Sequence, residues 1–508
     1  MNVTKLIVKN LPKYTTVKDV KKVFADVPLL KDLAVKVPPR LGYALVTLKS
    51  KDQLDEAQTV VSALTVKGNA LTASLYEPVM RPSKKARVDR STDEQAAPAV
   101  VDTRPAAERL ADQVTALHAM PYEEQLVTKR KTMLKVIDSF KREINKLYRN
   151  KGDGKAPPAA PHANQLLGET VASPQIDGYR TKNEFTIGLD SEKQLTVGFQ
   201  LGLFRDGITE IASADETRHT PQSAKSIAKH MQELARGMSY SAYSKSTHSG
   251  FWRGLLARTP STGEVMVAVQ YNPHGMDDAQ LDEVDAKILE HFTSDAAREK
   301  GINLTTLLVQ RHDGMAGGFT DKVPLKVLHG DGIVHEQILG YKFRLSPMAF
   351  FQVNQPATEV LYTIARKWAL DTNAAAVKPI LLDVCCGTGT IGITMSEHVS
   401  KVVGIEIVQS AVDDARTNAN ANNVANTEYI CSKAEDAIKG VIRQCEKIQS
   451  FVYIACNADA AKQNFIELCK PESKKYAGKP FILEKAVPVD LFPHTPHCEL
   501  VLRFIRSN

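Results

Sequence analysis

The last third of the chain contains three elements whose residue types suit chemistry on a pyrimidine base. Cys456 directly follows Phe451–Ala455, an apolar run that predicts a buried strand. Glu499 follows the turn-rich sequence FPHTPHC, and upstream Leu381–Gly392 reads LLDVCCGTGTIG, a strand that enters a glycine-rich turn. A thiolate is a strong nucleophile, a carboxylate can act as a base, and glycines let the backbone approach a nucleotide cofactor. Together these are the parts needed to methylate carbon 5 of a pyrimidine.

The proposed covalent chemistry assigns one task to each side chain. Attack of the Cys456 sulfur on carbon 6 of uracil would make carbon 5 a nucleophile that can accept a methyl group. Glu499 would then remove the proton from carbon 5, so that the cysteine can leave. The alternatives are a buried structural cysteine and an ordinary carboxylate at the rim of a strand. A zinc site at His494, His497 and Cys498 is disfavoured because no fourth ligand has suitable spacing.

The glycine-rich turn has the surroundings of a nucleotide-cofactor site. Gly387–Gly392 opens a helix, and the next strand, Val402–Ile405, is followed directly by Glu406. A carboxylate in this position relative to the turn can bind a ribose. Asp383 and the CGTGT turn favour S-adenosylmethionine over a dinucleotide. The alternative is an ordinary strand-to-helix turn followed by a surface glutamate.

The elements that position these residues form the end of a multidomain α/β chain. A β-α-β-β-α-β pattern over residues 1–78 predicts a ferredoxin-like RNA-recognition motif. Residues 79–121 predict a flexible linker, and residues 122–165 a long amphipathic helix with a second linker. Residues 166–345 predict a strand-rich α+β middle domain. The β-α alternation over residues 346–508 predicts a Rossmann-like domain with a mostly parallel sheet.

Composition sets broad limits on the function. The net charge of +7 gives weak support for an anionic partner. No run approaches the roughly 20 apolar residues of a membrane helix, and the N-terminal sequence is not that of a secretory signal. All seven cysteines lie at or after Cys385, which argues against an N-terminal metal cluster and a disulfide framework. These features predict a protein of the cytosol, the nucleus or both; the segment Lys84–Arg87 is either a nuclear localisation signal or a solvated basic turn.

Candidate RNA contacts occur in the first domain. Tyr43 is one aromatic residue on the expected stacking strands, with Lys9 and Arg40 as supporting charges. Ile7 and Leu45 occupy positions where aromatic residues are common. A single ring predicts weak RNA affinity, or a surface that faces another protein.

A second candidate RNA contact lies in the sequence GYRTKNEF of the middle domain. Tyr179, Arg180 and Lys182 form a basic and aromatic cluster there. Such a cluster suits a flipped base and its flanking phosphates. The alternative is a solvated turn before a strand.

Taken together, these motifs make the chain resemble the tRNA (uracil-5-)-methyltransferase family, most closely its eukaryotic branch with an N-terminal RNA-recognition motif. The segments SPQIDGYRTKNEFTIG and FRLSPMAFFQVN carry the resemblance outside the first and last domains. It implies formation of 5-methyluridine, typically in the T-loop of tRNA, with S-adenosylmethionine as cofactor, Cys456 as nucleophile and Glu499 as base. The cofactor contacts that it implies are Gln352, Cys385, Gly387, Gly389, Thr390 and Glu406. Bacterial rRNA members carry an N-terminal iron–sulfur cluster, which the lack of early cysteines excludes here.

The chain departs from this family at one place. The family has a DPPR-type motif at the end of the fourth strand of the sheet, and nothing between Ala434 and Cys456 matches it. Glu428–Cys431 predicts strand three and Phe451–Ala455 strand five, with one helix over Ala434–Ile448. A βαβ unit takes about 30 residues, so no fourth strand fits in this interval. Strand four lies between strands one and five in this fold class, and each unpaired interior backbone group costs roughly 1–3 kcal/mol.

Three functional hypotheses follow. The first is methylation of carbon 5 of a tRNA uridine. The second is a catalytically impaired isoform or RNA-binding remnant that lacks the DPPR-type motif, produced by a splice variant or a gene model without one exon. The third, methylation of protein or small molecules, leaves the N-terminal motif, Cys456 and Glu499 without a role.

Overall fold

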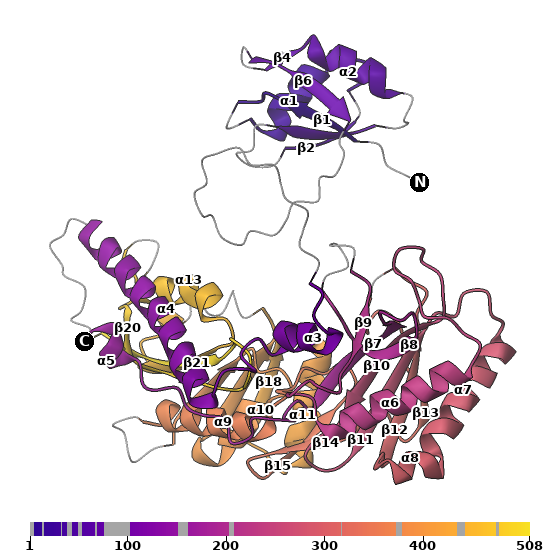
Figure 1. Cartoon of the computed structure of the whole chain (residues 1–508). Coiled ribbons are helices and arrows are strands. Elements are labelled where there is room, and N and C mark those ends of the chain that lie inside the picture. Colours follow the sequence, from indigo (N-terminus) through magenta and orange to yellow (C-terminus); the bar gives the residue numbers. More distant parts are fainter. Residues whose placement is uncertain are drawn as a thin grey trace. The chain divides into compact units, whose positions relative to one another are not determined.

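The computed structural model of the chain consists of two compact units, Met1–Pro98 and Ala99–Asn508 (Figure 1). The structure describes residues 5–12, 15–31, 33–37, 43–48, 53–66, 69–75, 102–150, 161–202, 208–315, 317–371, 378–433, 442–473 and 477–507. Arg40 and the segment Lys84–Arg87, both singled out above, lie outside these residues.

The N-terminal unit has the ferredoxin-like fold that its sequence pattern predicts. Its main sheet is antiparallel, with the strand order β2-β3-β1-β6. The elements are β1 (Lys5–Lys9), α1 (Val17–Phe24), β2 (Ala34–Lys36), β3 (Ala44–Thr47), α2 (Leu54–Ser62), β4 (Thr65–Val66), β5 (Asn69–Ala70) and β6 (Thr72–Leu75). Leu6 and Val8 of β1 point to the buried core with Val20 and Phe24 of α1.

The opposite face of this sheet is aliphatic at its centre. Ile7 of β1 pairs with Leu45 of β3, and both side chains are half-buried. Tyr43, directly before β3, is also half-buried, while Lys9 is exposed. The described parts of β1 and β3 therefore contain no aromatic residue, in agreement with the sequence.

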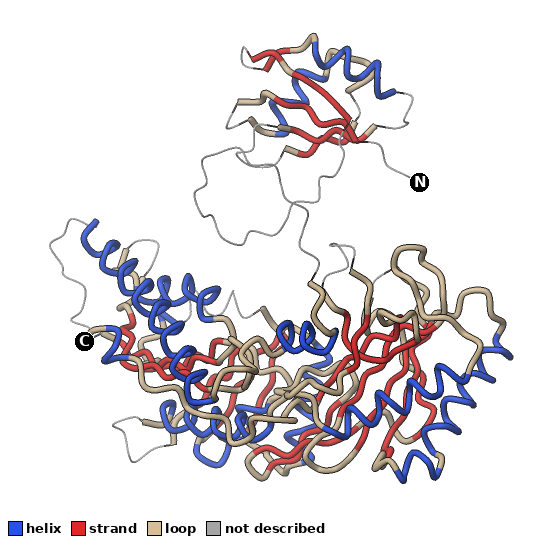
Figure 2. The backbone as a smooth tube through the Cα atoms, in the orientation of Figure 1, coloured by secondary structure: helices blue, strands red, loops and turns tan. Residues whose placement is uncertain are grey.

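The middle of the second unit is built on a seven-stranded mixed sheet with the order β13-β12-β11-β10-β7-β8-β9. Its strands are β7 (Lys182–Leu189), β8 (Leu195–Gln200), β9 (Ile211–Ser213), β10 (Trp252–Arg258), β11 (Val265–Tyr271), β12 (Leu304–Arg311) and β13 (Lys326–His329). The helices α6 (Gln222–Gly237), α7 (Asp278–Thr293) and α8 (Asp295–Glu299) lie on one face of this sheet (Figure 2). Residues of the other face, such as Leu256 and Met266, pack with the C-terminal domain.

Two helices precede this sheet in sequence. α3 (Ala106–Val114) lies inside the segment 79–121 that was expected to be a flexible linker, so that prediction is wrong for this part. Its apolar side is buried, because Leu110 packs with Leu201 and Ala212. The predicted amphipathic helix is α4 (Tyr122–Asn150), followed by the short α5 (Ala163–Leu166).

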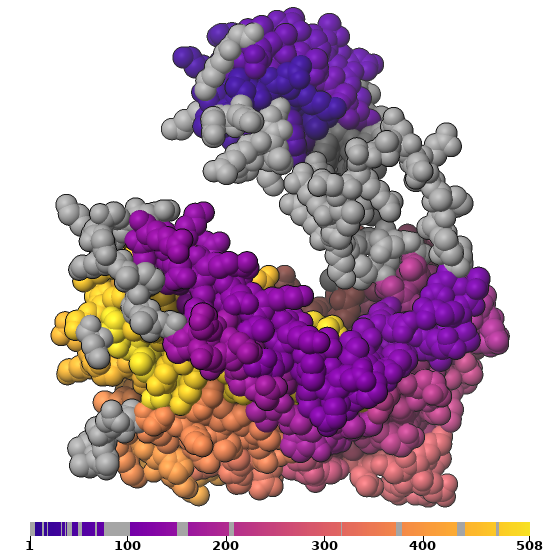
Figure 3. All heavy atoms as spheres, turned by 60° about the vertical axis from the view of Figure 1, so that its left-hand side comes forward, coloured from indigo at the N-terminus to yellow at the C-terminus, as the bar shows by residue number. Residues whose placement is uncertain are grey.

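The apolar side of α4 covers the C-terminal strands. Met133, Val136, Ile137 and Phe140 share a core with residues near the C-terminus, including Phe504. Figure 3 shows the purple segment around α4 next to the yellow C-terminal part of the chain. None of the described helices has the length and apolar character to cross a membrane.

The C-terminal domain follows the hairpin β14 (Val334–Ile338) and β15 (Tyr341–Leu345). Its elements are α9 (Gln355–Ala369), β16 (Ile380–Val384), α10 (Thr390–Met395), η3 (Ser396–His398), β17 (Lys401–Glu406), α11 (Gln409–Ala421), β18 (Thr427–Cys431), β19 (Ser450–Ala455), α13 (Ala458–Cys469), β20 (Phe481–Val489) and β21 (Glu499–Arg506). These strands form two separate sheets. One is parallel with the order β16-β17-β18, and the other is antiparallel with the order β19-β21-β20.

The separation of the two sheets agrees with the prediction that the sequence lacks a fourth strand between them. β16 pairs only with β17, and β19 pairs only with β21, among the residues that the structure describes. A cavity of about 2140 Å³ lies along both unpaired edges, lined by Ile380–Val384 on one side and Ser450–Ile454 on the other. The position that a central strand occupies in a continuous sheet is thus a cavity.

Candidate active site

The glycine-rich turn joins β16 to α10 through three left-handed residues. Cys385, Gly387 and Gly389 have φ values of 63°, 54° and 79°. A Cβ atom on Gly389 would lie 2.8 Å from the Tyr429 hydroxyl oxygen, so this position needs glycine for space as well as for conformation. The turn therefore has the glycine-dependent conformation that lets a cofactor approach the backbone closely.

Two carboxylates hold the turn in place. The Gly392 N–H donates to Asp383 Oδ2 at 2.9 Å, which fastens the helix start to the strand. Burial raises the pKa of Asp383 to about 6. Glu406 Oε2 accepts from the Gly387 N–H at 3.0 Å, and Glu406 Oε1 accepts from the Ile407 N–H at 2.8 Å. The structure thus places Glu406 beside the turn, as the spacing predicts.

A tyrosine that the sequence did not single out connects the turn to the rest of the site. The Tyr362 hydroxyl of α9 lies 3.1 Å from Thr390 Oγ1. Burial raises the pKa of Tyr362 to about 12, and the nearby carboxylates of Asp383 and Glu499 act in the same direction. Tyr362 therefore lies close to both the cofactor turn and the candidate base. It could not be found from sequence because it belongs to the apolar face of an ordinary amphipathic helix.

Gln352 reaches the same cavity from the segment before α9. The helix cap anchors this segment, because Asn354 is buried and its Oδ1 accepts from the Ala357 N–H. The side chain of Asn354 also donates to Ser173 Oγ and to the Leu491 carbonyl oxygen. These bonds connect the FFQVN segment to the loop before Glu499.

Cys456 and Glu499 lie at the same end of one strand pair. Ala455, the last residue of β19, pairs with Leu500 of β21, so the next register position brings Cys456 to Glu499. Both residues line the cavity; Cys456 is exposed, whereas Glu499 is 2 % exposed. Burial raises the pKa of Glu499 to about 7, and none of the described residues donates a hydrogen bond to its carboxylate. A carboxyl group with this pKa can take up a proton near neutral pH.

The loop before Glu499 is fastened by a buried ion pair that the sequence analysis missed. Lys129 of α4 lies 2.6 Å from Asp490 Oδ1, and the two side chains are 1 % and 0 % exposed. Lys129 also donates to the Phe492 carbonyl oxygen, and the Tyr122 hydroxyl donates to Asp490 Oδ2. Burial lowers the pKa of Lys129, against the attraction of the Asp490 carboxylate.

His494 has a structural place in this loop. It has a φ of 67°, and its N–H donates to Gln125 Oε1 at 2.8 Å. Its two ring nitrogens lie 3.1 Å from Gln125 Nε2 and 3.1 Å from Asp177 Oδ1. Both ring nitrogens of His494 therefore have hydrogen-bond partners within the second unit.

The three candidate RNA-contact residues of the GYRTKNEF segment have different surroundings. Tyr179 is buried and its hydroxyl donates to the Pro493 carbonyl oxygen at 3.1 Å, so its ring is not open to a stacking base. Lys182 forms an ion pair with Glu184 at 2.9 Å. Arg180 alone of the three lines the cavity, and burial lowers the pKa of its guanidinium group.

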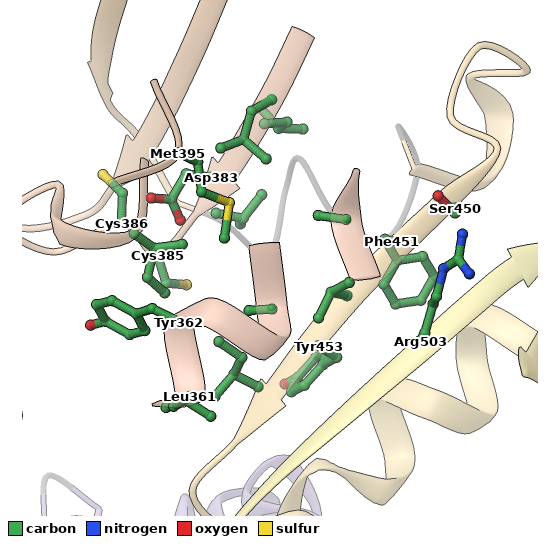
Figure 4. Close-up of a pocket in the computed structure, with 18 of the residues that line it drawn as sticks. Leu361, Tyr362, Asp383, Cys385, Cys386, Met395, Ser450, Phe451, Tyr453 and Arg503 are labelled. Carbon is green, nitrogen blue, oxygen red and sulfur yellow. The ribbon is translucent and has the colours of Figure 1, made fainter. Parts of the chain in front are cut away.

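The cavity collects most of the predicted site. Its lining includes Gln352, Cys385, Gly387, Thr390, Cys456 and Glu499; Gly389 of the turn and Glu406 beside the turn are not among the lining residues. Figure 4 shows Asp383, Cys385 and Tyr362 on one side of the cavity, and Phe451, Tyr453 and Arg503 on the other. The thiol of Cys456, the buried carboxyl group of Glu499 and the glycine-rich turn therefore face one space.

Comparison with family models gives two matches. Residues 333–444 match the model described as tRNA (Uracil-5-)-methyltransferase. Residues 6–72 match the RNA recognition motif. The two matches lie in the C-terminal part of the second unit and in the N-terminal unit.

Curated relatives cover nearly the whole chain. The "tRNA (uracil-5-)-methyltransferase homolog A" of Mus musculus is 34% identical, over 99% of this chain and 84% of the relative. That alignment spans 534 positions against the 508 residues here, so parts of the relative have no counterpart in this chain. The "tRNA (uracil-5-)-methyltransferase homolog B" of Homo sapiens is 34% identical, over 78% of this chain and 84% of the relative.

A solved structure shares the fold. The Pyrococcus abyssi tRNA (uracil-54, C5)-methyltransferase, in complex with S-adenosyl-L-homocysteine, aligns with a TM-score of 0.52 at 20% identity. The alignment covers 77% of this chain and 85% of that one. At this identity the likeness shows a common fold.

Proposed function

Because the chain belongs to the tRNA (uracil-5-)-methyltransferase family, we propose that it forms 5-methyluridine in the T-loop of tRNA, with S-adenosylmethionine as the methyl donor. The observation that carries this proposal is the placement of Cys456 opposite Glu499, at the end of one strand pair, in the cavity that also holds the glycine-rich turn.

In this mechanism Cys456 is the nucleophile and Glu499 is the base. The Cys456 thiolate forms a bond to carbon 6 of uracil, and the electrons of the 5,6 double bond move toward carbon 5 and the carbonyl oxygen of carbon 4. After carbon 5 has gained its methyl group, Glu499 accepts the proton of carbon 5. The double bond then forms again as the carbon–sulfur bond breaks, which frees Cys456. A base whose pKa is about 7 suits this transfer near neutral pH.

We propose that the cofactor binds at the turn between β16 and α10. The turn contains three left-handed residues, and Glu406 beside Gly387 can accept ribose hydroxyl hydrogen bonds. The residues proposed to hold the cofactor are Gln352, Cys385, Gly387, Gly389, Thr390 and Glu406. When bound, S-adenosylmethionine supplies an electrophilic methyl group on its sulfonium.

RNA contacts are proposed on both units. In the second unit, Arg180 is the basic residue that reaches the cavity, and Lys182 follows it on β7. In the N-terminal unit, Lys9 and Tyr43 remain the proposed contacts within the described residues. We also propose that the protein acts in the cytosol, the nucleus or both.

The unpaired edges of β16 and β19 favour a second candidate function. If the interrupted sheet cannot bind the cofactor, the chain is an RNA-binding remnant of a methyltransferase. Sequencing the transcript tests the origin of the missing strand: a message that is uniformly short in this region, together with soluble folded protein, would argue against a lost exon.

The decisive experiment is transfer of a labelled methyl group to an unmodified tRNA transcript. The proposal expects 5-methyluridine from the wild-type chain and none from Cys456→Ala. Cys431→Ala is the matched control, because Cys431 is exposed and does not line the cavity. Equal activity in Cys456→Ala would reject the covalent mechanism. Folded protein that binds tRNA without methylating it would establish the remnant.

A further inference from the structure

The cavity between the two C-terminal sheets has room for one extended strand. It is bordered by β16, five residues long, and by β19, six residues long, and each presents an edge without a partner among the described residues. Apolar side chains are open along it, including Ile380 at 68 % exposure. We call this space between β16 and β19 the strand slot.

Both faces of the strand slot are covered. Val452 and Ile454 of β19 pack with Leu361 of α9, whereas Phe451 and Tyr453 pack with Phe465 of α13. Alternate residues of a strand point to opposite faces, so α9 and α13 lie on opposite sides of β19. A strand beside β19 would be buried on both faces, and such strands are apolar at nearly every position.

The chain has too few residues to fill the slot itself with a strand parallel to its neighbours. Residues 432–449, between the end of β18 and the start of β19, are 18 in number. A parallel strand needs a crossover of about a dozen or more residues on each side, in addition to its own length. The segment between β18 and β19 therefore cannot supply an occupant with this orientation.

The lysines at one end of the strand slot indicate which end of the occupant is acidic. Lys378 precedes β16, Lys447 precedes β19, and both line the cavity. The opposite end contains Cys385 and Cys456, each directly after its strand. An occupant that runs parallel to β16 would carry acidic residues before its apolar run, where they meet the two lysines.

We propose that the strand slot binds, in trans, an extended segment of a different protein, with five or six apolar residues preceded by acidic residues. Paired on both edges, this segment joins the two sheets and closes the space beneath the cofactor turn and Cys456. This inference extends the proposed function, since the joined sheet would fix the two halves of that active site relative to each other.

The test uses the full chain and a synthetic peptide with two glutamates followed by six valine and isoleucine residues, labelled with a fluorophore. Fluorescence anisotropy should show saturable binding, and hydrogen exchange should slow at the amides of β16 and β19. A peptide with proline at the centre of the apolar run should bind at least about tenfold more weakly, because proline removes a ladder donor. Ile380→Glu should weaken binding similarly, whereas Val127→Glu, on exposed α4 surface, should not.

Each outcome decides a separate question. Absence of saturable binding, or equal binding of the proline peptide, overturns the inference. A dimer of the chain that Ile380→Glu dissociates overturns it too, because a second copy would then occupy the slot. Peptide binding without methyl transfer keeps the inference and rejects the proposed function. Full methyl transfer without peptide overturns the inference, because the two halves of the active site are then fixed without an occupant.

Discussion

The buried Glu499 should make the stability of the protein depend on pH. Its pKa is raised from 4.5 to about 7 by burial. A raised folded-state pKa means that the protonated carboxyl is favoured in the folded protein. This stabilisation is fully present below the unfolded-state pKa of 4.5 and is lost as the pH rises through about 7. The difference between the two pKa values is about 2.5, and each pKa unit is equivalent to about 1.4 kcal/mol. The change in the free energy of unfolding is therefore about 3 kcal/mol.

The substitution Glu499→Gln isolates this effect. The amide has the size of the protonated carboxyl and does not titrate, while Asp383 and the other titrating groups are the same in both proteins. The free energy of unfolding of wild-type protein, relative to Glu499→Gln, should therefore fall by about 3 kcal/mol between pH 4.5 and pH 8. Urea denaturation followed by circular dichroism at several pH values measures this difference.

A surface carboxylate supplies the control. Glu169 is exposed, so the free energy of unfolding of Glu169→Gln should stay within about 0.5 kcal/mol of the wild-type value at every pH. Parallel pH curves for wild type and Glu499→Gln would refute the argument. Water reaching the carboxylate through the cavity would then be the physical explanation, because hydration removes the penalty of burial.

Two further substitutions test the surroundings of the site. Lys129→Ala leaves the Asp490 carboxylate buried without its cation, and should lower the free energy of unfolding by about 3–5 kcal/mol in urea denaturation. The exposed Lys131→Ala on the same helix should change it by less than about 0.5 kcal/mol, and equal effects would refute a special role for the pair. Gly389→Ala brings a Cβ to 2.8 Å from the Tyr429 hydroxyl at a φ of 79°, and should cost about 1–3 kcal/mol. An unchanged melting temperature and unchanged calorimetric affinity for S-adenosylmethionine would contradict the observed conformation of the turn.

Local sequence determined the parts of the site that depend on neighbouring residues. The strand, turn and helix around Gly387 follow from apolar periodicity and from glycines at left-handed positions. Glu406 lies beside the turn because consecutive parallel strands end at the same edge of the sheet. The missing strand could be predicted because chain length alone limits how many crossovers fit between β18 and β19.

Other features exist only because distant segments meet. Lys129 and Asp490 are 361 residues apart, and nothing in either local sequence shows that they are buried together. Tyr179 was expected to face RNA, yet the loop before Glu499 covers it. α3 was expected to be part of a linker, but its Leu110 packs against Leu201 and Ala212.

The sequence identified Cys456 and Glu499, and the tertiary structure decided that they are adjacent and that Glu499 is buried. The types of the two residues and the strands beside them follow from local pattern. Their adjacency comes from the register of β19 with β21, and the raised pKa of Glu499 comes from exclusion of water by the surrounding fold. Burial is a property of the packed chain, because it depends on every segment that covers a side chain and on none of them alone.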